Sequence, residues 1–150
     1  MKATIDAVRV AGTPDGPVGV LVLAVEGDDE HVLPIFIGLE EATSIAHGLD
    51  AQDIGRPLTH DLLLDVMEEL GGRVDRVVVS DIDDGTYYAD LHVQTPRDMA
   101  VVDARPSDSL ALAARTNAPI EVDAGVFREG KRARDELAEL TDIREVTEFA

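Results

Sequence analysis

The first forty residues are predicted to form three strands. Apolar and polar positions alternate over residues 4–10, which is typical of a strand with one buried face. Residues 18–26 form a continuous Val/Leu-rich run, which indicates a strand buried on both faces. A turn at Gly27-Asp28-Asp29 leads into a third strand over residues 31–37, where Pro34 favours an edge or irregular position.

Helical periodicity then replaces the strand pattern. Residues 42–49 carry apolar side chains at positions i, i+3, i+4 and i+7, which predicts one buried helical face. A second helix is predicted to begin at Thr59, a favourable N-cap residue, and to end at Gly71-Gly72. The side chains expected to face the core from this second helix are Leu62, Leu63, Val66, Met67 and Leu70.

The same order of elements recurs after about 70 residues, although the residue identities of the two halves differ. Strands are predicted over residues 74–82, 86–95 and 99–104, and helices over residues 107–115 and 134–140. Because the strands meet by hairpins and the helices come in blocks, the pattern predicts an α+β fold. We expect a mixed, mostly antiparallel sheet with helices packed on it, and a possible internal duplication of a βββαα unit.

Composition fits one globular domain with an aliphatic core. The chain has 150 residues, of which 45% are hydrophobic but only 3% aromatic. It contains no cysteine, which excludes disulfides, thiolate metal sites and a cysteine nucleophile. No apolar run approaches the roughly 20 residues that cross a bilayer, and residues 1–6 do not resemble a signal peptide. We therefore expect a cytoplasmic protein without a membrane partner.

Charge is the strongest compositional signal. The chain has 31 acidic and 13 basic residues, a formal net charge of −18, and the acids are spread along its whole length. Such a charge opposes compaction at low salt, but molar salt shortens the Debye length to about 3 Å and screens it. The composition favours a halophile's cytoplasm. It also opposes tight binding of duplex nucleic acid, because phosphate contacts weaken as salt rises.

Polar residues gather at two predicted helix starts, residues 56–61 and residues 103–108. Each combines an arginine, a proline, a hydroxyl residue and aspartates, and helix N-termini with an adjacent arginine bind anions such as phosphate. In this hypothesis Arg56, Arg105 and Ser107 hold phosphate, and His60 activates or positions a water. Oxygen ligands for Mg²⁺ or Mn²⁺ would come from Asp61, Asp103 and Asp108, with Glu40 or Glu41.

The same residues also have a purely structural interpretation. Thr59, Ser107 and the neighbouring aspartates are ordinary helix-capping residues, each worth about 1 kcal/mol. Arg105 is then an internal ion-pair partner of Asp61 or Asp103. The adjacent Tyr87-Tyr88 can stack on a base, or one ring can point inward while the other covers the hairpin.

Three motifs follow one another along the chain: Leu33-Pro34-Ile35-Phe36-Ile37-Gly38 with Glu41-Ala42, then Arg56-Pro57-Leu58-Thr59-His60-Asp61-Leu62, then Asp103-Ala104-Arg105-Pro106-Ser107-Asp108-Ser109. In order and spacing they resemble the signature of the bifunctional nuclease (BFN) domain family. The resemblance covers about residues 1–122, with Pro119-Ile120 near its end, and leaves residues 123–150 as a C-terminal helical extension packed on or beside the domain. It implies an α+β domain and a nuclease acting on DNA and RNA. The polar positions that match the motifs are Arg56, His60, Asp61, Asp103, Arg105, Ser107 and Asp108.

Three functions are therefore open. The resemblance favours a divalent-metal-dependent nuclease that engages single-stranded nucleic acid weakly, with His60, Asp61, Arg105 and Asp108 as catalytic residues. The alternative is a non-catalytic binding or assembly module, a homo-oligomer such as a dimer. A third option is a sensor of small anions or nucleotides at the helix start that carries Arg105 and Ser107.

Overall fold

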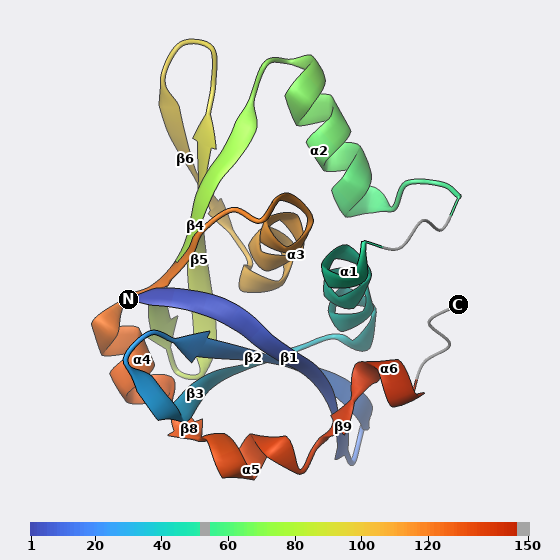
Figure 1. The fold of residues 1–150 in the computed structure, drawn as a ribbon, viewed down its shortest axis with the longest axis vertical. Coiled ribbons are helices and arrows are strands. Elements are labelled where there is room, and N and C mark those ends of the chain that lie inside the picture. Colours follow the sequence, from blue (N-terminus) through green and yellow to red (C-terminus); the bar gives the residue numbers. More distant parts are fainter. Residues whose placement is uncertain (52–54, 147–150) are drawn as a thin grey trace.

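A computed structural model describes residues 1–51 and 55–146, and it confirms the predicted α+β fold (Figure 1). The described strands form one nine-stranded sheet in the order β6-β5-β4-β7-β1-β2-β3-β8, and β9 pairs with β1 beside this path. The pairs are antiparallel except for β4 with β7. The strands are β1 (Lys2–Thr13), β2 (Gly16–Val25), β3 (Asp28–Ile37), β4 (Arg73–Asp83), β5 (Thr86–Gln94), β6 (Met99–Ala104), β7 (Ile120–Val122), β8 (Arg132–Ala133) and β9 (Thr141–Asp142). The helices are α1 (Leu39–Asp50), α2 (Thr59–Glu69), α3 (Pro106–Thr116), α4 (Ala124–Gly130), α5 (Arg134–Ala138) and α6 (Ile143–Val146).

The described part of the chain contains two βββα units. The first is β1–β2–β3 followed by α1, and the second is β4–β5–β6 followed by α3. The three strands of each unit form a meander, and the two meanders flank β7 in the sheet. The second helix of the predicted repeat is not equivalent in the two halves, because α2 follows α1 whereas β7 follows α3.

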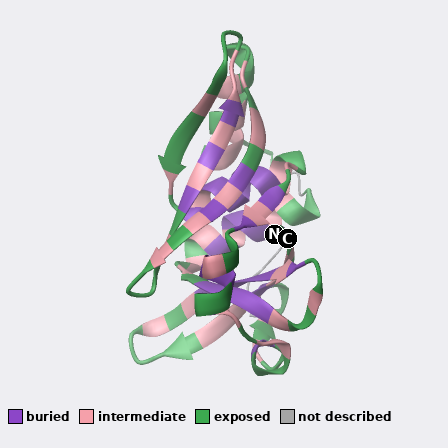
Figure 2. Ribbon diagram, turned by 90° about the vertical axis from the view of Figure 1, so that its left-hand side faces the viewer, coloured by how far each residue is buried: buried purple, intermediate pink, exposed green. Residues whose placement is uncertain are grey.

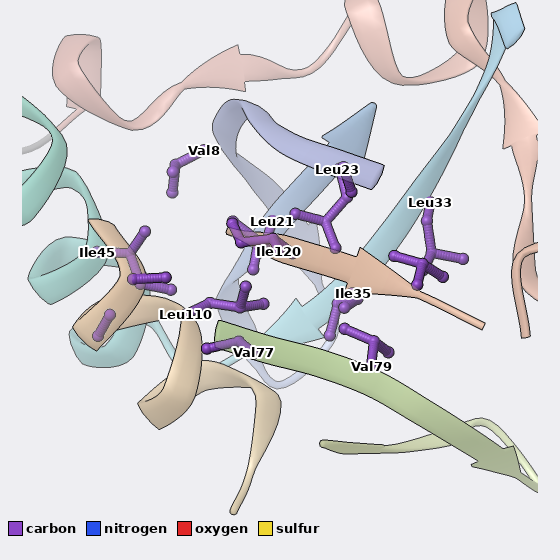
Figure 3. Packing of buried hydrophobic residues seen from close by; sticks show 14 of the residues in the cluster. Val8, Leu21, Leu23, Leu33, Ile35, Ile45, Val77, Val79, Leu110 and Ile120 are labelled. Atoms are coloured by element: carbon purple, nitrogen blue, oxygen red, sulfur yellow. The ribbon is translucent and has the colours of Figure 1, made fainter. Parts of the chain in front are cut away.

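Helices α1 and α3 cover one face of the sheet and bury the main core between the two halves (Figures 2 and 3). The alternation of β2 and β3 sends Leu21, Leu23 and Leu33 into this core, where each is fully buried. Ile45 of α1 and Leu110 of α3 meet them from the helical side and are also fully buried. The core is aliphatic, as the composition predicted.

The opposite face of the first meander is covered by the C-terminal segment. Val20, Val22 and Val32 point to this face and form a second buried cluster with Leu137 of α5. Strands β8 and β9 fasten the segment to β3 and β1. The prediction that residues 18–26 are buried on both faces is therefore confirmed, and the segment after residue 122 is what covers the second face.

The position of Pro34 agrees with its predicted edge character. It pairs with Val22 of β2 on one side, while on the other side β8 reaches only His31 and Val32. Pro34 therefore lies beyond the residues of β3 that pair with β8, where a missing backbone N–H removes no hydrogen bond to β8.

The prediction for α2 was wrong about which face is inward. Leu62, Leu63, Val66 and Leu70 are all exposed. The helix packs through Met67, as predicted, and through Leu64, which the prediction did not include. The reason is polar: His60 and Asp61 point toward α1 and α3, and the helical period of 3.6 places Leu64 and Met67 on the same side. No helix within the described residues is long and apolar enough to cross a membrane.

Unfolding measurements can test this arrangement. Leu110→Ala removes a fully buried side chain from the main core, so we expect it to lower the free energy of unfolding by about 2–5 kcal/mol. Val101→Ser changes an exposed side chain of β6, so its effect should stay within about 0.5 kcal/mol. Urea titrations of both variants at one salt concentration provide the comparison, and equal losses would contradict the assignment of Leu110 to the main core.

Candidate active site

Three helices begin at the site, and each carries an acidic residue at its third position: Glu41 in α1, Asp61 in α2 and Asp108 in α3. Carboxylates are favoured there because the helix dipole is positive at its N-terminus. Glu41 and Asp108 occupy equivalent positions in the two βββα units. The repeat therefore brings two acids to matching places on neighbouring helices.

The predicted N-caps were displaced by one or two residues. Thr59 and Ser107 are the first and second residues of their helices, and the N-cap positions are Leu58 and Arg105. At α2 the backbone N–H of Leu58 donates to Oδ2 of Asp61 at 2.9 Å, so the aspartate supplies the capping contact. Ser107 is buried in the first turn of α3.

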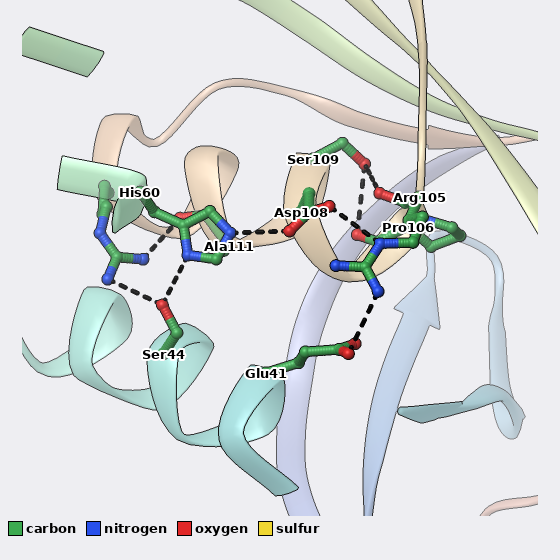
Figure 4. A network of polar contacts seen from close by, with 9 residues as sticks. Glu41, Ser44, His60, Arg105, Pro106, Asp108, Ser109 and Ala111 are labelled. Atoms are coloured by element: carbon green, nitrogen blue, oxygen red, sulfur yellow. Dashed lines mark hydrogen bonds and ion pairs between the residues drawn. The ribbon is translucent and has the colours of Figure 1, made fainter. Parts of the chain in front are cut away.

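Arg105 joins the two equivalent acids (Figure 4). Its Nε donates to Oδ2 of Asp108 at 3.0 Å, and its Nη1 donates to Oε1 of Glu41 at 3.3 Å. The guanidinium is 65% exposed, so solvent and ligands reach it. Partial burial alone would raise the pKa of Asp108, but hydrogen bonds from His60 and Arg105 outweigh it and hold that pKa below its usual value.

His60 connects Asp108 to Ser44 across the gap between α2, α3 and α1 (Figure 4). Its Nε2 lies 2.9 Å from Oδ1 of Asp108, and its Nδ1 lies 2.7 Å from Oγ of Ser44. An ionised carboxylate only accepts hydrogen bonds, so Nε2 carries the proton. In the neutral imidazole Nδ1 is then the acceptor, and the Ser44 hydroxyl donates to it.

Arg115 completes the network from the end of α3. Its Nη2 donates to Ser44 Oγ at 3.1 Å, its Nε donates to Asp61 Oδ1 at 2.7 Å, and its Nη1 donates to the carbonyl of Ala111 at 3.0 Å. The side chain is only 7% exposed, so the charge is buried with its hydrogen bonds satisfied. Burial would raise the pKa of Asp61, but Arg115 and the Leu58 N–H outweigh it and lower that pKa.

Ser44 and Arg115 were both missed by the sequence analysis. Ser44 lies within the periodic apolar face of α1, and Arg115 stands in the last turn of α3, where a basic residue is ordinary. The one available signal in the sequence was a hydroxyl at position 44, between Ala42 and Ile45 of the predicted apolar face.

A cavity of about 520 Å³ opens onto this network, and we call it the histidine cavity. Ser44, His60, Asp108 and Arg105 line it, together with Glu40, Glu41, Leu39, Thr43, His47, Leu58 and Thr59. Its size lies within the range of ligand-binding pockets. The polar network therefore faces a space that a small ligand or a chain segment can enter.

Two predicted site residues lie apart from this network. Asp103 is exposed in β6, where it is the register partner of Asp90 in β5. Arg56 is exposed before α2 and takes part in none of the hydrogen bonds or ion pairs described above. The ion pair that was suggested between Arg105 and Asp61 or Asp103 forms with Asp108 and Glu41 instead.

Two of the side chains predicted to bind Mg²⁺ or Mn²⁺, Asp61 and Asp108, make hydrogen bonds within the protein, and metal binding itself stays a prediction. Within residues 1–51 and 55–146 no three His, Asp or Glu side chains are arranged to hold a metal ion. Asp61 is occupied by Arg115 and the Leu58 N–H, and Asp108 is shared by His60 and Arg105. The residues that gather instead form a chain of hydrogen bonds built around His60.

Comparison with known proteins identifies the family. The model of the bifunctional nuclease domain matches residues 21–134. "Uncharacterized protein MT1877" and "Uncharacterized protein Rv1829", from two strains of Mycobacterium tuberculosis, are each 39% identical over 126 residues, covering 84% of this chain and 73% of each relative. "Bifunctional nuclease 2" of Arabidopsis thaliana is 27% identical over 123 residues, covering 79% of this chain and 37% of that protein. The chain belongs to the bifunctional nuclease domain family.

The lowered pKa values of Asp61 and Asp108 predict how stability depends on pH. A carboxyl group whose pKa is lower in the folded state stabilises the fold above its unfolded pKa of about 3.9. That stabilisation is lost as the pH falls through the lower, folded pKa. We therefore expect a steep loss of stability below about pH 4, and a shallower one in Asp61→Asn.

Urea unfolding at several pH values and constant salt measures this slope. Asp65→Asn is the matched control, because Asp65 is exposed on the same helix and takes part in none of the site contacts above. Equal slopes for wild type and Asp61→Asn between about pH 5 and pH 2 would rule out the proposed contribution of Asp61.

Proposed function

We propose that the protein is a nuclease that hydrolyses phosphodiester bonds in single-stranded nucleic acid, with His60 as its acid–base group. Membership of the bifunctional nuclease domain family and the relative named "Bifunctional nuclease 2" support the reaction class. The observation that carries the proposal is the directed hydrogen-bond chain from Arg115 through Ser44 and His60 to Asp108, which ends at an open cavity.

The direction of this chain suits proton transfer. Asp108 holds Nε2 of His60 in its protonated form and stabilises the imidazolium that arises when Nδ1 gains a proton. The Ser44 hydroxyl donates to Nδ1 and accepts from Arg115, which leaves one lone pair of Oγ for a water in the histidine cavity. The serine thus links the water to the histidine.

The proposed reaction moves one proton along this chain. A water oxygen attacks phosphorus while the water gives a proton to Ser44 Oγ, and Ser44 gives its own proton to Nδ1 of His60. The bond from phosphorus to the leaving ester oxygen breaks as that oxygen takes a proton from a solvent water, and Nδ1 of His60 then returns its proton to solvent through Ser44 Oγ. Arg105 is exposed at the edge of the cavity, where its guanidinium can stabilise the charge on the phosphoryl oxygens.

Charge limits the substrate to weakly bound single strands. A net charge of −18 repels a polyanion, so the protein gains little from long-range attraction. Binding must then depend on short-range contacts to a few nucleotides, which an unpaired strand offers more readily than a duplex. Arg105 is the proposed phosphate contact of this set, and Arg56 and Ser107 remain candidates for neighbouring phosphates.

Cleavage assays with matched histidine variants test the proposal. We expect His60→Gln to lower kcat by about 10²- to 10⁴-fold, because general acid–base catalysis contributes on that order. Ser44→Ala should lower kcat less, since a second water can replace the hydroxyl between substrate and His60. His92→Gln is the control, because His92 is half-buried in β5 and lines neither the histidine cavity nor its network.

The substrates are labelled single-stranded DNA and RNA in about 2–3 M KCl, which screens the net charge. Equal cleavage by His60→Gln and His92→Gln would remove His60 from the mechanism, and a folded wild type that cuts neither substrate would refute the nuclease.

Parallel reactions with Mg²⁺, Mn²⁺ or a chelator test the predicted metal dependence. We expect the divalent ions to stimulate cleavage, because an ion held by carboxylates and the substrate phosphate would polarise a phosphoryl oxygen.

A second candidate function, an assembly module, is favoured by the exposed apolar face of α2. Leu62, Leu63, Val66 and Leu70 form a stripe along this helix, and such exposed stripes often mark protein–protein contacts. We propose that the protein is a homodimer that uses this stripe. Dimerisation and catalysis are compatible, because His60 faces Ser44 of α1 and Asp108 of α3, whereas the stripe faces solvent.

Light scattering across a dilution series tests the homodimer. We expect wild type to have twice the mass of the chain, and Leu63→Glu to shift it toward the monomer by placing a charge within the apolar stripe. Tyr88→Glu, an equally drastic change at an exposed aromatic side chain of β5, should leave the mass unchanged. A wild type that stays monomeric at every concentration would contradict the assembly proposal.

A further inference from the structure

A second cavity, which we call the aromatic cavity, lies on the other side of Arg105. Its volume is about 490 Å³, and it shares Glu41 and Arg105 with the histidine cavity. The end of β3, the start of β5 and the first turns of α1 and α3 form its walls. The two cavities therefore meet at the Arg105–Glu41 ion pair, and a ligand held at Arg105 can extend into both.

The walls of the aromatic cavity combine aromatic and aliphatic residues with the polar residues Glu41, Thr86, Arg105 and Ser107. Phe36 and Tyr87 line it, with aliphatic side chains from Val18, Ile35, Ile37 and Pro106. Phe36 is 64% exposed, which is a large solvent contact for the ring of a phenylalanine inside a strand. Phe36 pairs in register with Val20, so its side chain leaves β3 on the opposite side from Ile35 and Ile37. It borders the cavity across the edge of β3 that extends beyond the pairing with β8.

Tyr87 is held more firmly than Phe36. Its hydroxyl lies so close to Gly130 of α4 that a Cβ at that glycine would overlap it, which fixes the ring against the C-terminal segment. Burial raises the pKa of Tyr87, so the phenol stays protonated at neutral pH. The neighbouring Tyr88 is exposed and does not line the cavity, which settles which of the two tyrosines faces it.

We propose that the aromatic cavity binds a nucleobase, stacked on Phe36 beside Tyr87, while Arg105 holds the adjoining phosphate. This inference rests on the proposed nuclease function and names the feature of the substrate that the site recognises. Stacking is tolerant of sequence and adds about 1–3 kcal/mol per base, so it selects unpaired bases over a duplex.

A base-binding site adds affinity that the acidic protein does not gain from phosphate contacts. Phosphate contacts weaken as salt rises, whereas the stacking of a base on an aromatic ring does not depend on ionic attraction. For a chain of net charge −18, a base held next to Arg105 supplies affinity that electrostatics does not. It also fixes the register of the strand, so that the phosphate on the other side of Arg105 faces His60 in the histidine cavity.

The binding experiment uses the full chain carrying His60→Gln, so that the substrate stays intact. The probes are a labelled hexamer of deoxyadenosine and the same hexamer with abasic sugars in place of its nucleotides. We expect the abasic strand to bind more weakly, and Phe36→Leu, which keeps an apolar side chain but removes the flat ring, to weaken binding of the intact strand about 5- to 150-fold. Phe36→Leu should have no such effect on the abasic strand.

Tyr88→Leu is the matched control, since Tyr88 is an exposed aromatic residue outside the aromatic cavity. Adenosine monophosphate and ribose 5-phosphate, compared by calorimetry, separate base recognition from capture of phosphate alone. Equal affinity for intact and abasic strands, or equal effects of Phe36→Leu and Tyr88→Leu, would overturn the base site even if the wild type cleaves. A loss specific to Phe36→Leu supports the base site even if cleavage is absent, which would refute only the nuclease.

Discussion

The close packing of α1 against α3 is the contact on which the rest of the structure depends. At Gly48 the helices approach so closely that a Cβ would lie 3.2 Å from the Cβ of Ala114 and 3.0 Å from Nη1 of Arg115. The two helices close the two βββα units, so their contact joins the halves of the fold and aligns their first turns. Glu41 and Asp108 consequently stand on either side of Arg105, and both cavities open at the same corner.

Much of the fold could be predicted because the burial of each strand is visible in its own pattern of apolar residues. The alternation around Val8 predicts a strand with one buried face. The unbroken apolar run over residues 18–26 predicts a strand buried on both faces. The helix starts at residues 59 and 106 were visible because acids, prolines and hydroxyls prefer the first turn. His60, Arg105 and Asp108 were found for the same reason, since each lies within or beside such a start.

The rest depended on contacts between distant parts of the chain. The pairing of Arg115 with Asp61 and Ser44 needs three helices in place, and nothing near residue 115 in the sequence distinguishes it from an ordinary helix-ending arginine. The orientation of α2 was mispredicted because its apolar residues outnumber those that one face can bury, and the polar contacts of His60 decided which side turned inward. The sequence likewise does not show that Arg115 pairs with Asp61 and Arg105 with Asp108, because the first of these pairs joins two different helices.

The shortest internal strand of the sheet has a consequence for how the molecule comes apart. β7 has three residues, yet it runs parallel to β4 of one half and antiparallel to β1 of the other. The N-terminal amine of Met1 and the backbone of Val122 add two hydrogen bonds of 2.9 Å and 2.8 Å at the same seam. If either meander unfolds, β7 loses one of its two neighbouring strands and the seam between the halves opens, so we expect both halves to unfold in one cooperative transition.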